Sequence, residues 1–321
     1  MLPEKANIIC LLKILSKYSD SNHPMAMGEI IEKMESLYGI KPDRRTIVSG
    51  IDTLIRLGYE ISTYGENKKG YYLISRDFEP GEIYLLVDAV CSFLFITERQ
   101  SLDLIRKLKD QLSIYERKNL NYLKIIRDGR KSLNRQVFYH IEEISKAMEE
   151  GLKVKFTYLK YNKEKELVPR REKKYTVNPY SMVYTNENYY LLCSLVYQEN
   201  LSLYRLDRMQ DLEITSYKID ENKDSGNPKE EIKGAVHAFL GQPERIKIVC
   251  EAHILDHLID GFGRDIDIRE REDGKLEVNF TAPAQGLVFW GLQYLSYAEI
   301  IEPVWVREKI IEFIMKNKYI E

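Results

Sequence analysis

Apolar residues recur every three to four positions in three stretches near the start of the chain. This spacing puts apolar side chains on one face of a helix and predicts helices at residues 5–18, 27–37 and 43–57. Gly39 follows the second stretch and favours a helix end there, because glycine accepts a left-handed backbone conformation. Asp43 stands at the start of the third stretch and is a residue type that caps helix N-termini.

Two short runs typical of β-strands follow the third helix, at residues 59–63 and 71–74. The polar, glycine-bearing turn between them predicts a hairpin. Three helices followed by a hairpin is the element order of a winged helix-turn-helix, and we assign residues 1–76 to such a domain.

The pattern changes further along the chain. Helical spacing predicts helices at residues 81–95 and 98–112, within a helical linker assigned to residues 77–136, and another at 137–150. From residue 152 to 219 the period becomes two, and turn residues separate the short alternating runs. This pattern predicts a small β-barrel.

The C-terminal part combines both patterns. Residues 220–229 are polar and are interpreted as a linker, and a short helix is predicted at 230–240. The remainder predicts a strand-helix-strand-strand-helix-strand order with a final helix, which is typical of a ferredoxin-like domain. The predicted fold is therefore α+β and multidomain, with the barrel domain at 137–220 and the C-terminal domain at 230–321.

Charge is unevenly distributed, although the net charge of the chain is only −2. Residues 105–135 contain ten basic and three acidic side chains, and residues 151–175 contain nine and three. Such segments indicate a local anionic partner, or else a solvated helix face and loop.

The four cysteines lie far apart among apolar neighbours and are interpreted as core residues in a reducing compartment. The N-terminal residues show no signal-peptide pattern, and the most apolar stretch, residues 83–96, is too short to span a bilayer. We therefore expect a cytoplasmic protein with no membrane partner.

Polar side chains lie off the apolar face of the third predicted helix. A recognition helix needs them, because its N-terminal end enters the major groove, where arginine can contact guanine and hydroxyl groups can reach phosphates or base edges. Lysines at the hairpin tip would lie along phosphates. Basic residues only slightly outnumber acidic ones in this segment, so the prediction of double-stranded DNA binding depends on the helix order. The candidate DNA-binding residues are Arg44, Arg45, Thr46, Ser49, Thr53, Lys68 and Lys69.

The sequence signals for a catalytic or metal site are weak. His253 and His257 share one face of a predicted helix around Asp256, similar to an inverted zinc-protease motif, but the acid is Asp and a third ligand is not evident downstream. A surface helix is the simpler interpretation. The Gly-Phe-Gly run at 261–263 lacks the flanking strand and helix of a dinucleotide-binding loop. We expect no enzymatic activity, no metal and no cofactor.

Three motifs occur in order within the predicted barrel. They are Asn178-Pro179-Tyr180, Tyr189-Tyr190-Leu191 and Arg205-Leu206-Asp207-Arg208-Met209. In this order, behind a helix-turn-helix, they resemble the WYL family, which is named after a Trp-Tyr-Leu run. The N-terminal segment resembles the helix-turn-helix usually fused to WYL domains, and residues 243–321 are similar to their C-terminal extension.

The resemblance implies a bacterial transcription regulator, homodimeric, whose WYL domain is an Sm-like barrel that senses a nucleotide or single-stranded nucleic acid. Arginine and tyrosine together suit phosphate and base recognition. The candidate ligand-binding residues are Tyr158, Lys160, Tyr189, Arg205, Asp207 and Arg208, with Arg205 and Asp207 expected on one face of a strand. The alternative is that the two arginines pair with Asp207, Asp211 or Glu213 and only brace the barrel.

The chain departs from the family pattern in three places. Tyr189 stands where the family has Trp, and Lys160 stands where it has a small polar residue. In the recognition helix, Ser49-Gly50 replaces the usual Arg-Asp pair, and Gly50 weakens the helix slightly.

Two other function classes remain open at this point. A nucleic-acid accessory protein would use the basic segments 105–135 and 151–175 to bind RNA or single-stranded DNA without acting at a promoter. An unrecognised enzyme would need stoichiometric zinc that depends on His257.

Overall fold

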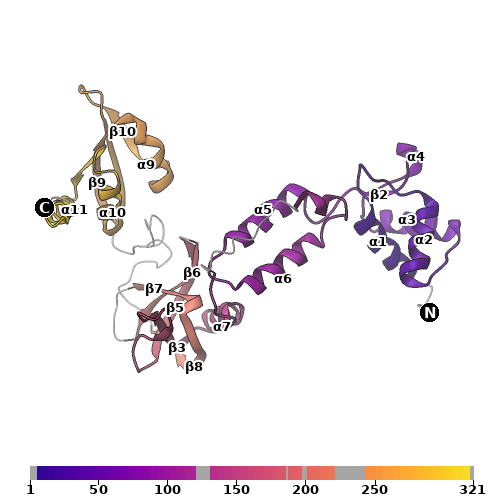
Figure 1. Ribbon diagram of the computed structural model, residues 1–321, viewed down its shortest axis with the longest axis horizontal. Coiled ribbons are helices and arrows are strands. Elements are labelled where there is room, and N and C mark those ends of the chain that lie inside the picture. The colour runs from indigo at the N-terminus through magenta and orange to yellow at the C-terminus, as the bar shows by residue number, and fades with distance from the viewer. Residues whose placement is uncertain (1–5, 121–130, 186, 197–200, 221–242, 319–321) are drawn as a thin grey trace. The chain divides into compact units, whose positions relative to one another are not determined.

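The computed structural model describes residues 6–318 except 121–130, 186, 197–200 and 221–242 (Figure 1). The chain divides into two compact units, Met1–Leu133 and Asn134–Glu321, with mixed α and β content. Within the described ranges no helix has the length and apolar character needed to cross a membrane.

The first unit begins with three helices and a small antiparallel sheet. These elements are α1 (Asn7–Tyr18), α2 (Met27–Tyr38), α3 (Arg44–Arg56), β1 (Ile61–Ser62) and β2 (Tyr72–Leu73). Their apolar faces meet in one core, which includes Leu11, Ile14, Ile30, Ile47, Ile51 and Leu54. The helices expected from the apolar spacing are therefore present, in the expected order.

Local residues set the boundaries of these helices. Gly39 ends α2 in the left-handed conformation, with φ of 67°. The Asp43 carboxylate accepts a hydrogen bond of 2.7 Å from the Thr46 amide and caps α3. A Cβ atom at Gly50 would lie 3.0 Å from Leu11 Cδ2. Gly50 therefore allows α1 and α3 to approach closely, which gives the glycine a packing role.

The hairpin differs from the prediction in detail. Each strand is two residues long, and the segment between them contains a single helical turn, α4 (Tyr64–Asn67). The Asn67 side chain fixes the chain just after this helical turn, because its Oδ1 accepts hydrogen bonds from the amides of Lys69 (2.6 Å) and Gly70 (2.9 Å). Thr63 and Glu66 form a capping box at its start.

Two further helices, α5 (Pro80–Ser92) and α6 (Glu98–Lys109), form an antiparallel pair followed by a short 3-10 turn at Glu116–Leu120. Buried polar contacts join this part to the N-terminal helices. The Ser113 hydroxyl donates to the Asp20 carboxylate at 2.7 Å, and the Arg76 guanidinium donates to the carbonyls of Ser16 (2.6 Å) and Ser19 (2.7 Å).

The second unit begins with α7 (Val137–Glu150) and a strongly bent antiparallel sheet. The strands are β3 (Leu152–Tyr161), β4 (Leu167–Pro169), β5 (Tyr175–Thr185), β6 (Asn188–Leu195), β7 (Leu201–Arg205) and β8 (Met209–Lys218). Their order is β8-β3-β5-β6-β7, with β4 added beside the end of β3. In the described ranges no strand pairing joins β7 to β8, so the predicted barrel is a curled half-barrel.

The C-terminal elements follow the predicted order. They are β9 (Pro243–Cys250), α9 (Leu255–Phe262), β10 (Asp267–Glu270), β11 (Leu276–Pro283), α10 (Leu287–Gln293), β12 (Ala298–Glu302) and α11 (Val304–Met315). The strands form an antiparallel sheet in the order β10-β11-β9-β12. Its core includes Ile246, Ile248, Phe280, Trp290 and Val306.

Some predictions fall on residues outside this description. The short helix predicted at 230–240 and nearly all of the linker predicted at 220–229 belong to this group, as does the middle of the basic segment 105–135.

Candidate DNA-binding surface and ligand site

Helix α3 buries its apolar side and exposes its polar side. Ile47, Ile51 and Leu54 are buried, while Arg44 and Arg45 lie on the outside. Thr46 and Ser49 are also exposed, and Thr53 is half-buried. The structure thus brings the five helix residues predicted from the sequence onto one surface.

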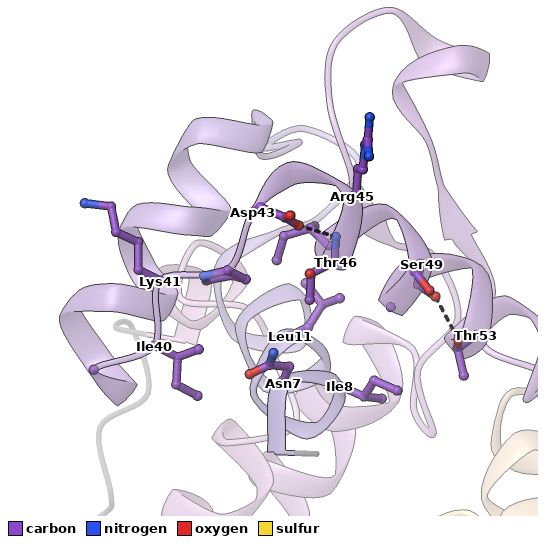
Figure 2. Close-up of a pocket in the computed structure, with 14 residues that line it drawn as sticks. Asn7, Ile8, Leu11, Ile40, Lys41, Asp43, Arg45, Thr46, Ser49 and Thr53 are labelled. Carbon is purple, nitrogen blue, oxygen red and sulfur yellow. Dashed lines mark hydrogen bonds between the residues drawn. The ribbon is translucent and has the colours of Figure 1, made fainter. Parts of the chain in front are cut away.

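Part of this surface is hollow. A depression of about 860 Å³ lies between the start of α1, the segment 39–43 and α3 (Figure 2). The Arg45 side chain projects outward from α3 beside the depression. The Thr53 hydroxyl donates a hydrogen bond of 2.7 Å to the Ser49 carbonyl. Because the Asp43 carboxylate accepts hydrogen bonds from Thr46, the pKa of Asp43 lies below its usual value. Asp43 is therefore ionised at neutral pH and keeps the helix start ordered.

The two hairpin lysines are placed differently from each other. Lys68 ends α4 in a left-handed conformation with φ of 59°, and its ammonium group donates to the Gly65 carbonyl at 2.8 Å. Lys69 is exposed beside it. Asn67, which sequence reasoning missed, shapes this tip; the Asn-x-x-Gly spacing of an Asx-type turn was the available signal.

The Arg-x-Asp-Arg motif of the half-barrel does not form the predicted strand face. Strand β7 ends at Arg205, and Leu206–Arg208 form a 3-10 turn. Arg205 folds back onto Asp207 in a two-bond ion pair, with Nε–Oδ1 at 3.0 Å and Nη2–Oδ2 at 2.9 Å. The prediction that Arg205 and Asp207 share one face of a strand is wrong, and the two side chains instead form the ion pair that the alternative interpretation expected.

This pair is largely enclosed. The side chain of Asp207 is 7% exposed and that of Arg205 is 25% exposed. Burial alone would lower the pKa of Arg205, but its hydrogen bonds and attraction to Asp207 outweigh burial and raise it. The charge of Arg205 is therefore satisfied within the protein.

Tyr158 belongs to an aromatic cluster behind this turn. Its ring meets that of Tyr204 edge-on at 4.9 Å, and Phe156 and Tyr175 complete the group. The Tyr158 hydroxyl accepts from the Arg205 amide at 3.3 Å. Burial raises the pKa of Tyr158, and it raises that of Tyr204 to about 12. These rings are core residues of the half-barrel.

The other predicted ligand residues are spread out. Lys160 is exposed near the end of β3, and Tyr189 is half-buried opposite Tyr184 in the β5–β6 ladder. The Arg208 guanidinium lies 5.3 Å from the Tyr161 ring centre. In the described part of the chain, contacts join Tyr158, Arg205 and Asp207. The six predicted residues do not line one common pocket there.

A basic hollow on the half-barrel was not predicted residue by residue. It has a volume of about 660 Å³ and is lined by Lys153, Arg171, Lys173, Lys174, Thr176, Leu195, Val196 and Tyr217. The excess of basic residues in 151–175 was the available signal. That signal could not show which of these cations share one surface.

The two histidines of the zinc-like motif pack against aromatic rings. His253 lies edge-on to Tyr297 at 4.8 Å, and His257 lies 5.4 Å from Tyr294. Among the described residues no group of three or more potential metal-ligating side chains is found.

Comparisons with known proteins identify one domain. No curated protein matches the chain. A solved structure of proteasome accessory factor B/C (PafBC) of Arthrobacter aurescens aligns at 15% identity with a TM-score of 0.27, covering 96% of this chain and 46% of that one. This chain therefore spans about half the length of that protein. The family model described as "WYL domain" matches residues 139–214, which are α7 and most of the curled sheet. The half-barrel of this chain is a WYL domain.

Proposed function

We propose that this protein is a homodimeric bacterial transcription regulator that binds double-stranded DNA through α3 and responds to an anionic ligand through its WYL domain. It acts in the cytoplasm, by binding rather than by catalysis. The observation that carries the proposal is the exposed polar face of α3, which presents Arg44, Arg45 and Ser49 over a buried apolar face. The WYL domain supports the regulatory part of the proposal.

The geometry of α3 suits the major groove. Its N-terminal turn carries both arginines, and this is the end of a recognition helix that contacts base edges. Neither guanidinium forms an ion pair or a side-chain hydrogen bond among the residues that the structure describes, although Arg45 lies near enough to Asp43 to help lower the pKa of that carboxyl, so each can donate to guanine or phosphate. Lys69, exposed at the end of the hairpin, would follow the adjacent phosphates.

In this proposal the response to the ligand reaches α3 through the linker helices. The Asp20–Ser113 hydrogen bond holds the segment after α6 against the N-terminal helices, and Arg76, just before α5, donates to the Ser19 carbonyl. Burial would raise the pKa of Asp20, but hydrogen bonds from Ser113 and His23 outweigh burial and lower it, so Asp20 stays charged. A ligand that favours one arrangement of the dimer would then change the spacing of the two α3 helices.

The test is duplex binding by the full chain. DNA fragments retained by the protein are selected from a bacterial genomic library, and their affinity is measured for the wild type and for the double variant R44A/R45A. We expect the double variant to lose at least about tenfold in affinity, since each good arginine contact is worth about 1–3 kcal/mol. The matched control is Lys13→Ala, which removes an exposed cation from α1.

Equal duplex affinity of the wild type and R44A/R45A contradicts the proposal. Loss of affinity in the Lys13→Ala control to the same degree shows a general charge effect and also contradicts it.

The basic hollow on the half-barrel favours a second candidate function, that of an RNA- or single-strand-binding accessory protein that does not act at a promoter. This function predicts that R44A/R45A leaves nucleic-acid binding intact. It also predicts that the wild type selects no duplex sequence.

A further inference from the structure

The WYL domain carries a cluster of cations outside the residues that its sequence motifs single out. Lys153, Arg171, Lys173 and Lys174 all border the hollow of about 660 Å³. We propose that this hollow, named here the basic groove, binds the phosphate groups of a nucleotide or of a nucleic-acid strand. The inference rests on the proposed ligand response of the WYL domain and moves the ligand site away from Arg205.

Arg171 is held in place for such a contact. Its guanidinium carbon lies 3.5 Å from the centre of the Tyr175 ring. Its Nε donates to the Lys173 carbonyl at 3.0 Å, and one Nη2–H donates to the Lys174 carbonyl at 3.2 Å. An arginine has five N–H donors, so most of the outer edge of the guanidinium is available. A fixed planar guanidinium fits two phosphate oxygens at once.

Lys173 supplies a second free charge beside Arg171. Its side chain is exposed, and its ammonium group has no acid partner in the described ranges. Because like charges held close together repel each other, an uncompensated pair of cations attracts anions to the surface between them.

The remaining two lysines are already paired within the domain. The ammonium group of Lys153 is 2.6 Å from Asp220 Oδ1, and that of Lys174 is 2.5 Å from Glu213 Oε1. Because hydrogen bonds from these lysines stabilise the carboxylates, the pKa values of Asp220 and Glu213 lie below their usual range. These pairs position the lysines along the groove and leave Arg171 and Lys173 as the principal anion contacts.

Apolar surface beside the cations points to a ligand that carries a ring. Tyr217 lines the groove and is 68% exposed, so its ring is open to a ligand. Leu195 and Val196 border the same hollow. A base or nucleoside can stack on an exposed tyrosine while its phosphate meets arginine, whereas inorganic phosphate would use only the cations.

Arg205 offers no comparable opportunity. Arg205 has as many N–H donors left as Arg171, but its Nε and Nη2 bonds, at 3.0 and 2.9 Å, go to a carboxylate that compensates its charge, and its side chain is only 25% exposed. The corresponding bonds of Arg171 go to neutral carbonyls. Breaking an enclosed ion pair leaves one charge unpaired and is costly. Of these two arginines, only Arg171 forms no ion pair with an acid among the described residues.

The experiment uses the full chain and two probes. Fluorescence anisotropy measures binding of a fluorescein-labelled thymidine strand of about ten nucleotides, a length that suits a single small domain, and ATP is the competitor. The variants are Arg171→Ala, Arg171→Lys and Lys173→Ala. The matched control is Lys163→Ala, because Lys163 lies on the same domain, is 91% exposed and is absent from the groove lining.

We expect Arg171→Ala to weaken binding about tenfold or more, and Lys173→Ala several-fold, because hydrogen bonds to charged groups are the strong ones. Arg171→Lys should remain weak, since lysine cannot make the two-bond contact. Lys163→Ala should bind as the wild type. Displacement of the strand by ATP identifies a nucleotide ligand, and failure of ATP to compete identifies the strand.

Three results overturn the inference. The first is that neither probe binds to the wild type. The second is that Arg171→Ala binds like Lys163→Ala. The third is that Arg208→Ala abolishes binding while the groove variants do not. None of these results affects duplex binding through α3, so the proposed function can survive when the basic groove fails.

Discussion

Two arginines of the WYL domain illustrate opposite uses of the same side chain. Arg205 belongs to a recognisable motif, yet it is enclosed and makes two bonds to Asp207. Arg171 lies in a loop without a motif, yet it is exposed and fixed by Tyr175 and two carbonyls. The difference teaches that a charged residue in a family motif can make an internal ion pair, while a loop outside the motif presents an exposed cation.

The largest expected effect is on stability and comes from removing the Arg205–Asp207 ion pair. Asp207→Ala leaves Arg205 unpaired inside the domain and should lower the free energy of unfolding by about 1.5–3 kcal/mol, the range for a hydrogen bond to a charged group. Thermal and urea denaturation of the full chain measure it.

The matched variant for this comparison is Glu213→Ala, which removes an acid whose side chain is 58% exposed. It should leave the melting temperature nearly unchanged, because exposed pairs contribute little. Equal destabilisation by the two variants would contradict this role of the Arg205–Asp207 ion pair.

The next effect concerns how the affinity for a single strand depends on salt concentration. Each phosphate that a protein neutralises on a single strand contributes about 0.7 to the slope of log affinity against log salt. Arg171→Ala should therefore reduce the slope for strand binding by about 0.7, measured by anisotropy at several salt concentrations. An unchanged slope in this variant, with Lys163→Ala as control, would show that Arg171 does not meet a phosphate.

A smaller effect, of the opposite sign, is expected at Glu213. Its carboxylate holds Lys174 at 2.5 Å and adds negative charge beside the groove. Glu213→Gln keeps the size of the side chain and removes this charge, so strand affinity should rise by about twofold to fivefold, as expected for one partly screened charge. A decrease in affinity would indicate that the Glu213–Lys174 pair holds the groove open.

The smallest effect is that of pH. Lys153 lowers the pKa of Asp220, and Lys174 lowers that of Glu213. The stability that each pair adds is therefore complete at neutral pH and is lost only as the pH falls through the lowered pKa. Strand affinity should be flat between about pH 6 and 8, because acids with ordinary pKa values near 4 stay ionised there. A titration within that window would point to a histidine instead.

The sequence predicted the helices of this protein better than its sites. Helical spacing located α7 to the residue, and Gly39 and Asp43 marked helix boundaries, because these signals are local. The strand order of the half-barrel and the position of β4 depend on pairings between distant residues, which no local pattern specifies.

Local sequence patterns could not give two features of the WYL domain that depend on tertiary contacts. The turn at Leu206–Arg208 is short and motif-bearing, so alternation suggested a strand, but the chain turns there between β7 and β8. Lys153 lies in β3 and Arg171 lies in the loop between β4 and β5, and only the folded sheet brings both residues to one hollow. The excess of basic residues in 151–175 indicated which segment is basic, but not which of its side chains share one surface.

The most direct test of the account joins its two surfaces. Affinity for the selected duplex is measured with and without saturating single strand or ATP, in the wild type and in Arg171→Ala. The account predicts that ligand changes duplex affinity in the wild type and leaves it unchanged in Arg171→Ala, while both proteins bind the duplex equally without ligand. An equal response of the two proteins, or no response in the wild type, would contradict it.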